Sequence, residues 1–432
     1  AHNLKVGGSN PSPATNLMNL LFKNFHSSIN NNQNKSLFII SLAPLYFLLG
    51  NLFINLFFII LFLVFISEVF KKDEREFLKD TIFWLIILFA FSLLINIFFS
   101  SYPVNSLPRV LKIFIIIGSI FLIKKSFIKQ QFLFEKRIFG TWTTIFLVVF
   151  FDIIFEIIFG FNIFGFTSYY PGRIASFFND ELVAGGFFLG FSFFTLSYFL
   201  NFFSQYKKTI ILYVLVMVLV SFLIGERANF IKFFLGISIF ILITQRKKWK
   251  IYVIGFFSLF LLFSAIIYSS NKYHNRYIVQ IEKVFEKNGI SNYLKESQYG
   301  AHYNSAYQIL KNYPIFGVGI KNFRKEVGKN EYENKDYKKT TLRWGTHPHQ
   351  IHFELLSETG LFGYMVFLFF IFSSIYLSCK NYIKHKNDFQ LSGILFVTLS
   401  IIPYLPTGSF FSTFSSGLFW INYAIMVSYI KK

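Results

Sequence analysis

Long runs of apolar side chains recur along almost the whole chain, and they restrict its fold more than any other feature. A helix needs about 20 apolar residues to cross the hydrocarbon core of a bilayer, where backbone polar groups must bond to one another. The chain is 54% hydrophobic and 15% charged. The sequence therefore predicts an all-α, polytopic integral membrane protein with about 12 membrane-spanning helices. The apolar segments lie near residues 37–49, 51–69, 81–100, 110–123, 138–158, 181–203, 209–225, 228–244, 251–270, 358–379, 390–407 and 411–429.

The basic residues between these segments predict an orientation. Lys and Arg accumulate in the cytoplasmic loops of membrane proteins. The loops 71–80, 124–137, 204–208, 245–250 and 380–386 hold 18 Lys and Arg, whereas the alternate short loops hold 3. Both termini are therefore expected in the cytoplasm, and the alternate loops are expected outside.

This topology divides the chain into four parts. Residues 1–35 are polar, which predicts a disordered segment and leaves open that it is foreign to the natural protein. Residues 36–270 would hold the first nine spans and residues 351–432 the last three. Residues 271–350 would form a large periplasmic loop, because loops longer than roughly 60 residues are exported regardless of charge.

The expected outer loop has 14 Lys and Arg against 7 Asp and Glu. Within it, "NSAYQILKNY" (304–313) predicts a short helix, and "PIFGVG" (314–319) predicts a glycine-rich turn. The net charge of +21 would indicate a nucleic-acid partner in a soluble protein, but cytoplasmic Lys and Arg explain much of it here. No nucleic acid is therefore expected. The single Cys379 excludes an intramolecular disulfide and a thiolate metal cage.

Each of three short outer loops carries one arginine: Arg109, Arg173 or Arg227. Arg227 lies in a turn of about four residues between two expected spans, where an arginine is costly and indicates function. Guanidinium groups bind phosphate oxygens through paired hydrogen bonds. The loops are therefore expected to bind a lipid-linked diphosphate. The alternative is that each side chain only extends to the membrane interface.

Three of the eight histidines lie within the stretch "THPHQIHFELLSETGLFG" (346–363). A helix is expected to start here, with Thr346 or His347 as N-cap, Pro348 at the first position and His349 in the first turn. The helix dipole would keep an imidazole neutral at this place, as a general base requires.

Helical spacing from His349 reaches His352, Leu356, Gly360 and Gly363, so one face would carry two histidines and then two glycines. The glycines would let another helix approach closely. Two other interpretations stay open. A metal site would need a fourth ligand and lacks a recognised zinc spacing, and the histidines could be ordinary interfacial residues at a helix start.

Four polar residues interrupt the apolar segments: Lys112, Asp152, Glu156 and Lys232. Asp152 and Glu156 are four residues apart and would share one helical face. They are expected to pair with basic residues between helices, because no further carboxylates in the spans extend a proton path.

The segments "NYPIFGVGIKNF" and "HPHQIHFELLSETGLFG" resemble the signature of the bacterial O-antigen ligase and polymerase family. These are polytopic glycosyltransferases that act on polyprenyl-diphosphate glycans. The ligase pattern has His, then Asn, Ser or Gln, nine residues, Gly, two residues, and Gly, Thr or Tyr. It is met by His349, Gln350, Gly360 and Gly363.

Two arginine regions also resemble the family, namely Arg227 with Ile231 and the loop "GRIASFFNDELVAGG" (172–186) that contains Arg173. The chain departs from the family pattern before "PIFGVG", where an arginine is common and His302 and Tyr307 stand here. It departs again at "NDE" (179–181).

The resemblance implies a GT-C-like fold and an inverting glycosyl transfer that needs no metal and no cofactor. The implied function is that of an O-antigen ligase at the periplasmic face of the bacterial inner membrane, in lipopolysaccharide biosynthesis. The donor would be a glycan on undecaprenyl diphosphate, the acceptor would be the lipid A-core, and membrane lipid would surround the protein.

The resemblance also implies roles for single residues. His349 and Arg227 would be catalytic. The diphosphate contacts would be Arg173, Arg227, Arg276 and Arg343. The supporting residues would be His352, His347, Gln350, Gly360, Gly363, Gly317 and Gly319.

Other functions remain open. An O-antigen polymerase would join lipid-linked repeat units, and a protein O-oligosaccharyltransferase would use a protein acceptor. A lipid or glycan transporter is the remote alternative, because transporters spread charged residues through several spans whereas this chain concentrates them outside.

Overall fold

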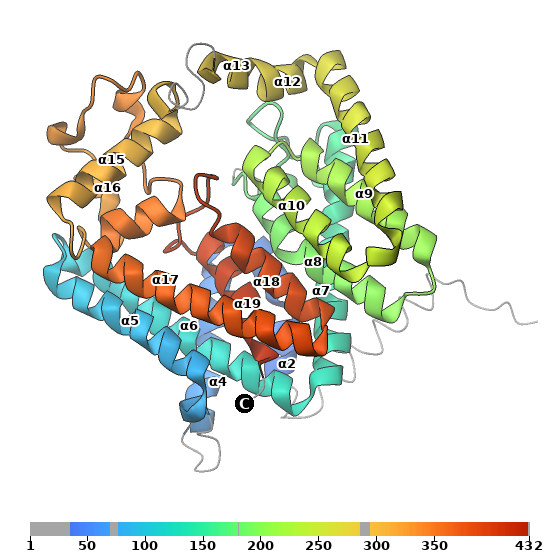
Figure 1. The fold of residues 1–432 in the computed structure, drawn as a ribbon, viewed down its shortest axis with the longest axis horizontal. Helices are drawn as coiled ribbons and strands as arrows, with labels where there is room; N and C mark the ends of the chain where they lie inside the picture. Colours follow the sequence, from blue (N-terminus) through green and yellow to red (C-terminus); the bar gives the residue numbers. More distant parts are fainter. Residues whose placement is uncertain (1–34, 70–76, 180, 286–293, 431–432) are drawn as a thin grey trace, which may run out of the picture.

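The computed structural model describes residues 35–69, 77–179, 181–285 and 294–430 (Figure 1). Every regular element in this part of the chain is a helix, so the prediction of an all-α protein is confirmed. The segment expected to be disordered, residues 1–35, lies outside the described residues except for Lys35.

Eight helices among the described residues are long and apolar enough to cross a membrane, and the protein is therefore a multi-pass membrane protein. They are α4 (Asn51–Val69), α5 (Thr81–Phe99), α6 (Pro103–Lys129), α7 (Gln131–Phe159), α8 (Ala184–Phe202), α10 (Arg227–Thr244), α11 (Trp249–Ser269) and α17 (Ile351–His385).

Shorter apolar helices account for the rest of the predicted segments. They are α2 (Lys35–Ser41), α3 (Ala43–Leu48), α9 (Lys207–Leu223), α18 (Asp388–Ser400) and α19 (Phe414–Ser428). All twelve predicted apolar segments are thus largely helical, but four of them form helices of at most 17 residues. The number of 12 spans and the orientation in the membrane stay predictions.

Helix α19 lies at the centre of the fold, where α6, α8 and α18 pack against it. All its residues except Ser415 are buried, and its aromatic side chains Trp420 and Tyr423 are fully enclosed. Figure 1 shows α18 and α19 between α5, α6 and α17 on one side and α8, α9, α10 and α11 on the other. A short helix is tolerated here because protein, rather than lipid, surrounds its ends.

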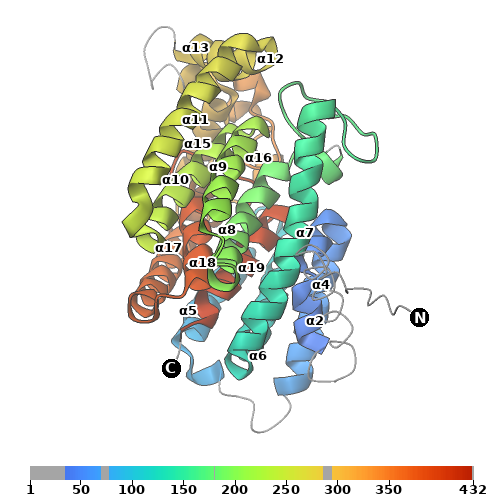
Figure 2. The same ribbon diagram turned by 90° about the vertical axis from the view of Figure 1, so that its right-hand side faces the viewer.

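A smaller group of helices lies at one end of the bundle, above α10 and α17 in Figure 1. It begins with α12 (Asn271–His274), a π-helical turn (Asn275–Val279) and α13 (Gln280–Phe285), and continues with α15 (Gln298–Asn312) and α16 (Phe323–Glu326). Figure 2 shows the same end projecting beyond α10 and α8. Short 3-10 turns lie at Ser176–Phe178, Arg246–Lys248, Asn330–Tyr332 and Thr340–Leu342.

This region has its own small hydrophobic cluster, formed by Ala306, Ile309, Val318, Phe323, Val327 and Tyr332. The helix expected at 304–313 is confirmed as part of α15. The expected glycine-rich turn is also confirmed, since Gly317 and Gly319 have positive φ angles of 68° and 99°. The location of the region outside the membrane stays a prediction.

Helix α17 is interrupted at Gly360, whose φ of 65° and ψ of −172° are not helical. Residues 314–319 bond to the interrupted turn: the N–H of Val318 donates to Ser357 O (3.0 Å), and the N–H of Phe362 donates to Ile315 O (3.0 Å). A Cβ on Gly360 would overlap the Ile315 carbonyl. The expectation that Gly360 admits another helix is therefore wrong, because a loop occupies that space.

We expect Gly360→Ala to lower the thermal unfolding midpoint of the purified protein more than Gly160→Ala does. Both positions have positive φ, but a Cβ added at Gly160 would meet no heavy atom within 4 Å. Gly160 is left-handed, which costs another residue about 1–2 kcal/mol, whereas the Gly360 conformation is open essentially to glycine alone. Equal midpoints for the two variants would show that the loop can move away from Gly360.

Candidate active site

His347 and His349 precede helix α17, whereas His352 lies in its first turn. The N-cap is Gln350, whose side-chain oxygen accepts from the N–H groups of His352 (2.7 Å) and Phe353 (3.2 Å). His349 has a left-handed φ of 57° and lies outside the helix. The predictions of Thr346 or His347 as N-cap and of His349 in the first turn are therefore wrong. The left-handed residue redirects the chain just before Gln350 caps the helix.

The left-handed turn brings His349 into a cluster with two other histidines. The ring of His349 lies 4.2 Å from that of His347 and 5.2 Å from that of His302, between centroids. Tyr299 lies edge-on at 5.9 Å. His302 and Tyr299 come from α15, so the cluster joins two segments nearly 50 residues apart. The sequence did not predict that His302 belongs to this histidine cluster. The only sequence signal for His302 was that the chain departs from the family pattern at this position.

His352 belongs to a different environment. Its Nε2 atom lies 2.7 Å from Ile401 O, and its Nδ1 atom lies 3.0 Å from the Tyr364 hydroxyl. The predicted common face of His349, His352, Gly360 and Gly363 is therefore wrong, since His349 precedes the helix and Gly360 interrupts it.

The clustered histidines are held neutral. Burial, together with the neighbouring His347 and His302, lowers the pKa of His349 to about 3. Burial and the positive charge of Lys321 lower the pKa of His347 to about 4. Burial also lowers the pKa of His302, whose Nδ1 lies 2.9 Å from Arg343 O. Among the described residues, the Nε2 atom of His347 is buried and has no hydrogen-bond partner.

Three of the predicted arginines meet around the turn between α9 and α10. The positive charges of Arg227 and Arg173, after burial, lower the pKa of Arg276. Arg227 donates to Arg276 O (3.0 Å), and Arg276 donates to Gly225 O. A Cβ on Gly225 would overlap the Gly172 carbonyl, so the loops that carry Arg173 and Arg227 touch.

One carboxylate lies among these cations. Glu226 forms an ion pair with Arg173 (3.1 Å) and also accepts from the N–H of Gly185 (3.1 Å). Arg173 donates in addition to Leu182 O (2.7 Å), while its Nε is buried without a partner among the described residues. Three guanidinium groups against one carboxylate leave a net positive group that can bind an anion.

Asp152 and Glu156 hold the loop that carries Arg173. Glu156 accepts from the N–H groups of Ala175 (3.2 Å) and Ser176 (2.6 Å), and Asp152 accepts from the Ser176 hydroxyl (2.5 Å). The expectation that these carboxylates pair with basic residues is therefore wrong. The backbone N–H groups of a buried loop need acceptors, and the two carboxylates supply them.

Arg343 does not join the other arginines. The residue is 3% exposed, and its guanidinium donates to the carbonyls of Val327 (3.2 Å), Thr340 (3.0 Å) and Lys329 (3.4 Å). Gly317 and Gly319 likewise lie away from the histidines, where residues 314–319 bond to α17.

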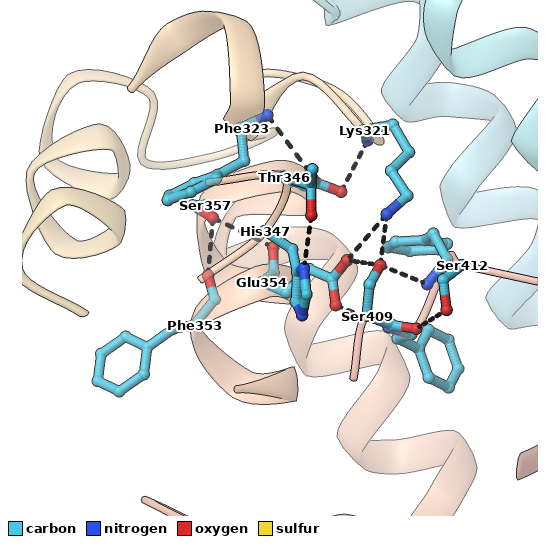
Figure 3. Close-up of polar contacts among 12 residues, drawn as sticks. Lys321, Phe323, Thr346, His347, Phe353, Glu354, Ser357, Ser409 and Ser412 are labelled. Carbon is cyan, nitrogen blue, oxygen red and sulfur yellow. Dashed lines mark hydrogen bonds and ion pairs between the residues drawn. The ribbon is translucent and has the colours of Figure 1, made fainter. Parts of the chain in front are cut away.

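A buried polar network that sequence reasoning missed lies beside His347 (Figure 3). Lys321 Nζ donates to the Ser409 hydroxyl (2.5 Å) and lies 3.9 Å from Glu354 Oε1. The Ser409 hydroxyl donates to Glu354, and the N–H of Lys321 donates to Glu358 (2.7 Å). Glu354 and Glu358 are fully buried, and their spacing of four residues in an apolar run was the available signal.

The loop between α18 and α19, residues 401–413, connects the parts of the site. The N–H of Thr407 donates to His349 O (2.8 Å). On one side of Thr407, Pro406 O accepts from Lys232 of α10 (3.0 Å). On the other side, Ser409 contacts Lys321, and Thr413 accepts from Lys112 of α6 (3.2 Å). His349, the helix that starts with Arg227, and α6 are thus bonded to one loop.

The described residues contain no group of three or more His, Cys, Asp or Glu side chains that could hold a metal ion. The chemistry that they do offer is a neutral imidazole cluster and a cationic group, both at the end of the bundle where α10 and α17 begin.

In a comparison with protein families, residues 182–368 match the O-antigen ligase family model, Wzy_C. The family resemblance noted in the sequence is thereby confirmed over these residues. The domain is shared by O-antigen ligases and polymerases, which are glycan-transferring membrane enzymes with lipid-linked glycan substrates. The matched range contains Arg227, Arg276 and the histidine cluster, but neither Arg173 nor residues 401–413. A search of curated proteins gave no match.

The depressed histidine pKa values predict that stability falls as the pH is lowered from about 6.5 to 5. An unfolded histidine binds a proton below its ordinary pKa of 6.5, whereas folded His347 and His349 do so only near 4 and 3. Protonation in this window therefore favours the unfolded chain, by up to about 1.4 kcal/mol per pH unit and histidine.

The measurement is the thermal midpoint of the purified protein at several pH values. The double variant His347→Gln/His349→Gln should show a weaker pH dependence than the wild type, and His385→Gln, an exposed histidine, should not. Identical slopes for the wild type and the double variant would contradict the buried, neutral state of the cluster.

Proposed function

We propose, from the premise that residues 182–368 are a Wzy_C domain, that the protein is an O-antigen ligase. It would transfer a glycan from undecaprenyl diphosphate to the lipid A-core, at the periplasmic face of the bacterial inner membrane. The observation that supports this most directly is the connection of neutral His349 and the Arg227 helix through residues 406 and 407. Such a site combines a proton acceptor with cations for a leaving diphosphate.

Arg173, Arg227 and Arg276 are assigned to the donor diphosphate. The bond between the anomeric carbon and the diphosphate oxygen breaks, and negative charge grows on the leaving group as it departs. Guanidinium groups match phosphate oxygens through paired hydrogen bonds. Glu226 holds Arg173 in place before the donor arrives, and an incoming diphosphate would compete with this carboxylate for the guanidinium.

His349 is assigned as the general base. An acceptor hydroxyl attacks the anomeric carbon from the side opposite the diphosphate, which inverts the configuration, and its proton passes to the imidazole. A pKa of about 3 makes the free imidazole a weak base. A bound diphosphate would raise that pKa because nearby negative charge favours the protonated ring. The base would thus gain strength when the donor is bound.

The remaining predicted residues are assigned to positioning. Gln350 caps α17 next to His349, and His347 and His302 pack against the His349 ring. Gly317, Gly319, Gly360 and Gly363 support the interrupted part of α17 and its loop. His352 contacts Ile401 at the start of the 401–413 loop. Arg343 is assigned to holding the loop that ends at the histidines, through its three carbonyl contacts.

The His349, Gln350, Gly360 and Gly363 pattern favours the ligase over the other member of the domain family. An O-antigen polymerase is the second candidate, because the Wzy_C domain is shared by both enzymes. In that case, the same donor site would face a second lipid-linked repeat unit as acceptor.

We expect His349→Ala to lower the initial rate of glycan transfer by about 10²–10⁴-fold, the usual contribution of a general base. The assay uses purified protein, an undecaprenyl-diphosphate glycan and lipid A-core, and the thermal midpoint reports folding. The matched control is His385→Ala, because His385 is exposed in the last turn of α17, whereas His349 precedes the first turn. A near-normal rate for a folded His349→Ala protein would remove His349 from the chemistry.

A further inference from the structure

A second group of cations lies on the α6 side of the histidines. Arg109 and Lys112 belong to the first turns of α6, and Lys321 precedes α16. The positive charges of Arg109 and Lys321 both act on the Lys112 ammonium group, and that of Lys321 acts on His347. Arg109 was expected in a loop, but α6 begins at Pro103, so the arginine is fixed on a helix.

Two of these cations lack a counter-ion. Neither Arg109 nor Lys112 forms an ion pair with a carboxylate within the described part of the chain, and Lys112 donates only to the Thr413 hydroxyl (3.2 Å). The buried carboxylates Glu354 and Glu358 face Lys321 instead. Both unpaired side chains are half-buried. Charges left unpaired in such surroundings are costly, and they are commonly functional.

The second group is separate from the Arg173–Arg227–Arg276 group. Along residues 401–413, Pro406 bonds to α10, Thr407 bonds to His349, and Thr413 bonds to Lys112. Along this loop, the contact with His349 therefore lies between the contact with α10 and the contact with Lys112. Pro406 and Thr413 are seven positions apart in the sequence, which limits the distance between them to roughly 25 Å. One short loop thus carries the contacts with α10, with His349 and with Lys112 of α6.

We propose that Arg109 and Lys112, the two cations of this group that lack a counter-ion, bind a phosphate or diphosphate carried by the acceptor. This inference rests on the proposed glycosyl transfer, in which the arginine group is occupied by the donor. Two kinds of acceptor would supply such an anion. A phosphorylated lipid A-core would do so in a ligase, and the diphosphate of a second lipid-linked repeat would do so in a polymerase.

The test is steady-state transfer by the purified full chain with three acceptors: lipid A-core, its dephosphorylated form, and a lipid-linked repeat unit. The variants are Lys112→Met, which removes the charge at similar length, and Arg109→Gln. Lys112→Arg keeps the charge. Lys247→Met is the matched control, because Lys247 is an exposed cation in the turn before α11, away from this group.

For the phosphorylated acceptor that the protein uses, Lys112→Met and Arg109→Gln should raise KM by roughly 10-fold or more, the effect of losing a charge-assisted hydrogen bond. KM for the donor, and KM for the dephosphorylated acceptor, should stay the same. Lys112→Arg should retain most of the affinity, and Lys247→Met should match the wild type. The acceptor whose KM rises in Lys112→Met and Arg109→Gln is the one that carries the bound phosphate or diphosphate.

Equal increases in KM for the donor and acceptor would overturn the proposal, as would equal increases for the phosphorylated and dephosphorylated acceptors. Arg109→Gln provides the same comparison if Lys112→Met does not fold. Equilibrium binding of each acceptor, measured without donor, tests the second anion site separately from the proposed function. No transfer by the wild type contradicts the proposed function, whereas equal acceptor Kd values for the wild type and Arg109→Gln contradict the second anion site.

Discussion

The contact of Lys321 with Ser409 and Glu354 fixes the loop on which the rest of the site depends. Lys321 and Glu354 are buried, and removing one partner of a buried ion pair typically costs about 3–5 kcal/mol. Ser409 bonds to both charged side chains. If the loop at residues 401–413 moved away, Lys321 and Glu354 would lose this polar partner inside an apolar interior. Two residues before Ser409, Thr407 bonds to His349, and Pro406 bonds to α10.

In the proposed reaction, the electrostatics of the site would change when the donor diphosphate binds. Without a ligand, Glu226 pairs with Arg173, Arg227 and Arg276 donate to backbone carbonyls, and the histidines are neutral because they are buried. A diphosphate would neutralise the arginines and make a proton on His349 less unfavourable. In the proposed reaction, the donor therefore prepares the base before the acceptor hydroxyl loses its proton. This order would protect the lipid-linked glycan from attack when the site is only partly assembled.

The sequence predicted what depends on local pattern. Apolar runs predicted the helices, and the Gly317 and Gly319 spacing predicted a turn. The family motifs directed attention to His349 and to arginines that the structure does bring together, namely Arg173, Arg227 and Arg276. The use of these residues in a reaction stays a prediction.

Contacts between distant segments could not be predicted in this way. Gln350, a residue seldom expected as an N-cap, caps α17 only because His349 turns the chain first. His302 reaches His349 because α15 packs on α17. Glu354 lies in an apolar run, and its partners Lys321 and Ser409 are 33 and 55 residues away. Pairings over such distances follow from the packed fold and leave no periodic trace in the sequence.

The central claim is a direct displacement of undecaprenyl diphosphate by an acceptor hydroxyl. It is tested by incubating the purified protein with an undecaprenyl-diphosphate glycan and an acceptor, then quantifying both products and determining the anomeric configuration of the new bond. The account predicts one undecaprenyl diphosphate released for each glycan transferred, with inversion at the anomeric carbon. Retention of configuration, or movement of the intact lipid-linked glycan without release of undecaprenyl diphosphate, would contradict it.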